Sequence, residues 1–103
     1  FDWPDLHGVL DKIEEEIGEL REAVDRGAQA DIADETGDLL FALVNLARHL
    51  RVNPDSALRA TNQKFERRFN HVEDQVEARG GDWQKFNLEQ LDLFWDEAKE
   101  KGL

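Results

Sequence analysis

Hydrophobic residues recur at helical spacing along most of the chain and predict four helices. In the first, over about residues 4–26, apolar positions follow one another in alternating steps of four and three, which is a heptad seam. The seam consists of Leu6, Leu10, Ile13, Ile17, Leu20 and Val24. Pro4 suits the first helical turn and Gly27 supplies a stop. We therefore expect this helix to pack on other helices along the seam.

The second predicted helix, over about residues 30–50, is more apolar. Residues 39–44 are hydrophobic nearly all round the helix, which is typical of a buried, central helix. Asn53 and Pro54 predict the next helix start, as the N-cap and the first helical residue. This third helix runs to about Arg79, before two glycines. Its apolar stripe consists of Leu58, Phe65, Phe69, Val72 and Val76.

The fourth predicted helix follows a short loop and completes an all-α pattern. It starts after Asn87, has Gln90 placed for a capping box, and ends near Gly102. No segment alternates in the manner of a strand, so we predict an all-α, four-helix bundle-type domain over residues 1–103. Three short helices would not cover the apolar second helix. We therefore expect homodimerisation to complete the core.

Composition narrows the classes of function. The formal net charge is -11, which argues against binding to a nucleic acid polymer or an anionic membrane. The longest apolar run, residues 39–44, is far shorter than the roughly 20 residues of a membrane span. The chain has no cysteine, and we expect a cytoplasmic protein. It begins at Phe1 rather than at a methionine, as a fragment of a longer chain would.

Acidic residues gather on two of the predicted helices at the edges of their apolar faces. Glu16 and Glu19 share one stripe of the first helix, and Glu35 and Asp38 share a stripe of the second. Packing of the two helices would bring these carboxylates together, where they must be protonated, paired with bases or bridged by cations. Mg²⁺ or Mn²⁺ suits such oxygen ligands. A solvated acidic face is the alternative that periodicity alone leaves open.

Three strings, in order, resemble the MazG family. Residues 15–19 and 35–40 match the family's E-E-x-x-E and E-x-x-D pattern. The similarity continues through residues 41–50 and through the N-x-K-F-x-x-R-F string at 62–69. The chain looks most like the C-terminal catalytic domain of bacterial MazG, over nearly its whole length. These proteins are all-α nucleoside triphosphate pyrophosphohydrolases.

The resemblance implies metal-dependent hydrolysis of a nucleoside triphosphate to a nucleoside monophosphate and pyrophosphate. Its implied metal ligands are Glu16, Glu19, Glu35 and Asp38, the same four acids. For the substrate, it implies that Lys64 and Arg68 approach the phosphates and that Trp95 helps to hold the nucleotide. We add Lys12, which lies on the stripe of Glu16, to the predicted substrate-binding residues.

Lys64 and Arg68 lie four residues apart, so they share one face of the third helix. Together with the four acids, they make up the predicted catalytic set. Two other functions stay open. One is a base-specific relative that acts on dUTP, dCTP or phosphoribosyl-ATP, with the same metal cluster. The other is a helical interaction module without catalysis. The sequence does not choose a base, a sugar, the number of metal ions or the general base.

Overall fold

The computed structural model describes residues 5–103 and contains four α-helices and one 3₁₀ turn. No strand occurs in this part of the chain, so the all-α prediction is confirmed. The chain divides into two compact units, one up to Asp55 and one over Ser56–Leu103. That residues 1–103 act as one domain stays a prediction.

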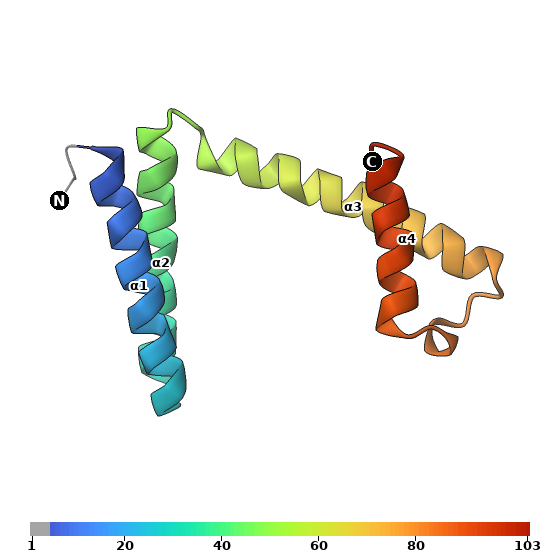
Figure 1. Ribbon diagram of the computed structural model, residues 1–103, viewed down its shortest axis with the longest axis horizontal. Coiled ribbons are helices and arrows are strands. Elements are labelled where there is room, and N and C mark those ends of the chain that lie inside the picture. The colour runs from blue at the N-terminus through green and yellow to red at the C-terminus, as the bar shows by residue number, and fades with distance from the viewer. Residues whose placement is uncertain (1–4) are drawn as a thin grey trace. The chain divides into compact units, whose positions relative to one another are not determined.

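The first unit is a helical hairpin of α1 (Leu6–Arg26) and α2 (Gln29–His49), which lie side by side (Figure 1). The Asp5 side chain caps α1 by accepting a hydrogen bond of 2.8 Å from the Gly8 amide. Gly27 ends α1 with a φ of 73°, a left-handed conformation that a glycine adopts without strain. The predicted helical position of Pro4 lies outside the described residues.

The face that α1 packs against α2 differs from the predicted seam. Its buried residues are Val9, Ile13, Glu16 and Ala23. From the seam, Leu6, Leu10, Ile17 and Val24 are 38–55% exposed, and only Ile13 is buried. The prediction of one packing seam was therefore wrong in this detail. Because α1 packs on a single helix in this unit, it buries one stripe and leaves its second apolar stripe outside.

The helix α2 is largely exposed in the described chain, in agreement with the expectation that the other helices do not cover it, and its burial by a second copy stays a prediction. Only Ala42 is buried, and it packs with Val9 and Ile13. The apolar run instead points largely outward, and Phe41 is 71% exposed and Leu40 59%. A two-helix hairpin covers only one side of each helix, and this geometry explains the exposure.

The second unit contains all but the first two residues of α3 (Pro54–Ala78), together with the 3₁₀ turn η1 (Trp83–Lys85) and α4 (Leu88–Glu100). The helix α4 crosses the C-terminal half of α3 (Figure 1), where Val72, Val76 and Phe94 form the core. The predicted capping box of α4 is confirmed. Asn87 accepts from the Gln90 amide at 2.8 Å, and the Gln90 side chain accepts from the Asn87 amide at 2.9 Å.

His71 is buried under α4, and its Nε2, which has no hydrogen-bond partner, lies 3.5 Å from a carboxylate oxygen of Glu97. None of the helices between Asp5 and Leu103 has both the length and the apolar character that crossing a membrane requires.

Candidate functional site

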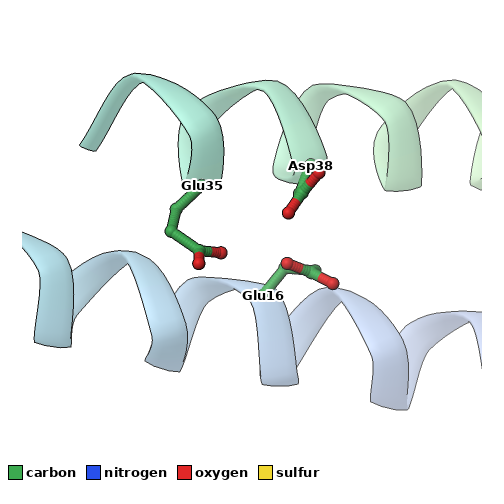
Figure 2. Close-up of side chains that lie close together, drawn as sticks. All are labelled: Glu16, Glu35 and Asp38. Carbon is green, nitrogen blue, oxygen red and sulfur yellow. The ribbon is translucent and has the colours of Figure 1, made fainter. Parts of the chain in front are cut away.

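Three carboxylates from the two helices of the first unit converge between them. Glu16 comes from α1, and Glu35 and Asp38 come from successive turns of α2 (Figure 2). One oxygen from each residue lies within 4.8 Å of the others. We call these residues the acidic trio. The i, i+3 spacing on α2 puts Glu35 and Asp38 on one face, opposite Glu16, as the helical periodicity predicts.

Burial distinguishes this cluster from an ordinary acidic surface. Glu16 is only 5% exposed and belongs to the buried stripe of α1, rather than to its edge as predicted. One oxygen of Glu16 and one of Glu35, the Oε2 atoms, are buried without a hydrogen-bond partner. Carboxylate oxygens removed from water without partners are costly. Oxygen ligands are the kind that Mg²⁺ prefers, so the trio fits such an ion.

Lys12 lies beside the trio and pairs with one of its members. Its ammonium is 2.9 Å from Glu16 Oε1 and 3.5 Å from Glu15 Oε1. The hydrogen bond to Glu16 is the main reason that the pKa of Lys12 is raised above its usual value. Glu15 itself is largely exposed. Lys12 therefore brings a cation to the rim of the acidic trio and satisfies one Glu16 oxygen, while Oε2 stays unpartnered.

Glu19, the fourth predicted acid, lies outside the trio, but charges within the trio raise its pKa. The negative charge of Glu16 is the largest cause that raises the pKa of Glu19, followed by burial and by the charge of Glu35. The side chain is only partly exposed. The structure thus brings three of the four predicted acids together and places the fourth within their electrostatic reach.

The other predicted substrate-binding residues, Lys64, Arg68 and Trp95, belong to the second unit. Lys64 is exposed on α3. Arg68 is half-buried one turn later, and its Nε donates a hydrogen bond of 3.0 Å to the Leu103 carbonyl oxygen. Its guanidinium carbon lies 5.8 Å from the ring centroid of Trp95 on α4. The structure therefore brings Arg68 and Trp95 into contact.

Sequence reasoning missed the surroundings of Arg68. Rings run in succession from Trp95 to Phe65, Phe69 and Trp83, with centroids 5.3–5.8 Å apart. The i, i+4 spacing of Phe65 and Phe69 could have indicated their stacking. The contact of Arg68 with Leu103 leaves no such signal, because the acceptor is a backbone oxygen that any residue carries.

Comparison with known proteins identifies relatives over the whole chain. Residues 6–73 match the family model of the MazG nucleotide pyrophosphohydrolase domain. A protein of Thermotoga maritima named nucleoside triphosphate pyrophosphohydrolase/pyrophosphatase MazG is 46% identical over 96% of this chain and 38% of its own length. The nucleoside triphosphate pyrophosphohydrolase of Escherichia coli K12 is 47% identical over 100% of this chain and 40% of its own. The chain thus spans about two-fifths of the length of these curated relatives.

Proposed function

Since this chain belongs to the MazG nucleotide pyrophosphohydrolase domain family, we propose that it hydrolyses nucleoside triphosphates to nucleoside monophosphates and pyrophosphate, with Mg²⁺ and broad specificity for the base. The observation that carries the proposal is the acidic trio, in which two buried carboxylate oxygens have no hydrogen-bond partner. Buried carboxylate oxygens without partners lower the stability of the fold unless a cation neutralises them. Binding to another protein alone does not require such carboxylates.

The residues that would hold the ion are Glu16, Glu35 and Asp38, with Glu19 at their side. Mn²⁺, which favours similar oxygen ligands, could replace Mg²⁺ there. When bound, such an ion neutralises phosphate charge and lowers the pKa of a coordinated water. The proximity of the three oxygens, within 4.8 Å of one another, supports their acting as one site.

The cationic residues would neutralise the triphosphate. Lys12 lies at the rim of the trio and is charged at neutral pH, as a lysine of ordinary pKa is. The hydrogen bond to Glu16 raises its pKa further. Arg68 offers a planar fork of donors and Lys64 a compact charge, two complementary ways to bind phosphate oxygens. We propose that Lys12 in the first unit, and Lys64 and Arg68 in the second, each bind phosphate oxygens of the substrate. In the proposed reaction, water attacks the α-phosphorus and pyrophosphate leaves.

We also propose a homodimer. Support comes from the outward apolar stripe of α1 and from α2, where Phe41 and Leu40 are more than half exposed. Monomeric proteins rarely expose contiguous apolar patches beyond a few hundred Å². A second copy that covers these helices would turn each exposed stripe into a core, as in other helical bundles.

The experiment is a product analysis on a panel of ribo- and deoxynucleoside triphosphates, with and without Mg²⁺, on the wild type and on Glu16→Gln and Asp38→Asn. We expect monophosphate and pyrophosphate from several bases, only with the metal, and at least a hundredfold lower turnover in both variants. Turnover confined to a single base would instead indicate a base-specific relative. If no nucleotide is cleaved, the enzyme proposal fails, and if both variants stay active, the site is wrong.

A further inference from the structure

Arg68 is held from two sides by groups of its own unit. Its Nε donates to the Leu103 carbonyl oxygen at 3.0 Å, and its guanidinium lies over the ring of Trp95, 5.8 Å from the centroid. The position of Leu103 is itself fixed, because its amide donates to the Ala98 carbonyl oxygen at 3.0 Å at the end of α4. Arg68 is thus anchored to a helix end and to an aromatic face.

The ring that faces Arg68 is also fixed. Trp95 is half-buried and packs against the core of Val72, Val76 and Phe94. Its ring centroid lies 5.3 Å from that of Phe65. A ring held on several sides restricts the rotamers of the side chain that packs on it. Since an arginine loses much rotamer freedom when it binds a ligand, prior restriction lowers that cost.

The anchoring leaves the phosphate-binding donors of Arg68 unoccupied by these contacts. A guanidinium has five N–H donors, and the bond to Leu103 uses the one on Nε. The donors on the two Nη atoms form the fork that matches two phosphate oxygens. The contact with Trp95, with the guanidinium carbon 5.8 Å from the ring centroid, is a cation–π contact and uses none of the N–H donors in a hydrogen bond. Both contacts therefore orient Arg68 without consuming the fork.

We infer that Trp95 is a positioning residue, which acts with the backbone oxygen of Leu103 to orient Arg68 toward a phosphate group. The inference rests on the proposed function, since it assigns a role in triphosphate binding. The resemblance to the MazG family implies only that Trp95 helps to hold the nucleotide, which an aromatic ring can also do by stacking on the base. A ring that stacks on the base matters only for ligands that have a base, whereas a ring that orients Arg68 matters equally for inorganic triphosphate.

The first experiment compares Trp95→Leu with Trp95→Phe, which keeps an aromatic face. For each variant, KM and kcat are measured with several nucleoside triphosphates, and the inhibition constant is measured for inorganic triphosphate. For Trp95→Leu, we expect all KM values and this inhibition constant to rise by the same factor, about two- to tenfold, because Arg68 must then be immobilised when the ligand binds. The value of kcat should change less, and Trp95→Phe should restore most of the affinity.

A double-mutant comparison isolates the pair. In an Arg68→Ala background, Trp95→Leu should weaken triphosphate binding no further, because the residue through which it acts is gone. An unchanged inhibition constant for inorganic triphosphate in Trp95→Leu, together with KM changes that depend on the base, would overturn the inference and favour stacking.

A second measurement does not depend on turnover. In ¹⁵N NMR spectra of the full chain, the Arg68 Nε–H signal should shift when Trp95→Leu removes the ring current, and the Arg68 signals should respond to added inorganic triphosphate. An Arg68 signal that shifts neither on the Trp95→Leu substitution nor on addition of inorganic triphosphate would contradict the inference. If the wild type cleaves no nucleotide, the proposed function fails while this titration still decides whether Trp95 orients Arg68 for phosphate.

Discussion

Replacement of Glu35 by glutamine should have opposite effects on stability in the absence and in the presence of Mg²⁺. Glu35 faces two other carboxylates, with oxygens of all three within 4.8 Å, and its own Oε2 is buried without a hydrogen-bond partner. At 4.8 Å, two unit charges repel by about 1 kcal/mol in water and by about 3.5 kcal/mol at the effective dielectric constant of 20 that suits protein sites. The glutamine has no charge, and its amide can donate to the neighbouring carboxylates.

The ion pair of Lys12 with Glu16 already offsets part of this repulsion. We therefore expect Glu35→Gln to raise the free energy of unfolding in chelator by about 1–2 kcal/mol, well below the full pairwise sum. For a domain of this size, each kcal/mol corresponds to roughly 4–8 °C in Tm. With Mg²⁺ at a hundred times its Kd, the wild type should gain about 2.7 kcal/mol, whereas the variant should lose most of that gain.

The assay is thermal unfolding followed by circular dichroism in EDTA and along a Mg²⁺ titration. Glu22→Gln is a matched control, because Glu22 is exposed on α1 and its replacement removes the same single charge from a chain of net charge -11. The control should change Tm little in EDTA and keep the full response to Mg²⁺. A Glu35→Gln variant that is less stable than the wild type in EDTA, or that keeps the wild-type response to Mg²⁺, would refute the reasoning.

Three further predictions test the assembly and the second unit. Phe41→Asp, at a side chain that is 71% exposed, should leave the helix content unchanged but convert the dimer to a monomer in analytical ultracentrifugation. A wild-type protein that is already monomeric at high concentration would contradict the proposed dimer. Asn87→Ala should remove the capping box of α4 and cost about 1 kcal/mol in urea unfolding, with Glu89→Ala, which leaves both cap hydrogen bonds in place, as the control. Val76→Ala, at a fully buried position, should cost roughly 2 kcal/mol in the same measurement, and a loss below about 0.5 kcal/mol would mean that this core does not stabilise the unit.

Local signals in the sequence were sufficient to predict the helices and where they begin and end. Gly27 ends α1 because a left-handed residue suits a helix C-terminus, and the reciprocal bonds of Asn87 and Gln90 follow from their spacing alone. Such signals depend only on neighbours in the chain. Which face of a helix is buried depends on how many partners it has. The outward position of Ile17 and the burial of Glu16 on α1 therefore could not be derived from periodicity.

In the candidate site, too, the features that depend on sequence spacing could be predicted, whereas those that depend on the packing of the helices could not. The i, i+3 spacing of Glu35 and Asp38 placed them on one face of α2, and the predicted convergence with Glu16 is present. That the Oε2 atoms of Glu16 and Glu35 are buried without hydrogen-bond partners could not be predicted, because it depends on how deeply Glu16 lies in the packed hairpin. Equally, the pairing of Arg68 with Trp95 and Leu103 depends on how α4 crosses α3.

The most direct test of the central claim is a crystal structure with Mn²⁺ and a triphosphate whose α,β-bridging oxygen is replaced by an imido group. The account predicts anomalous peaks at roughly 2.1 Å from oxygens of Glu16, Glu35 and Asp38, the distance typical of a small divalent ion, with the phosphates of the analogue on the same ions. Mn²⁺ bound elsewhere, or phosphates held away from the acidic trio, would contradict it.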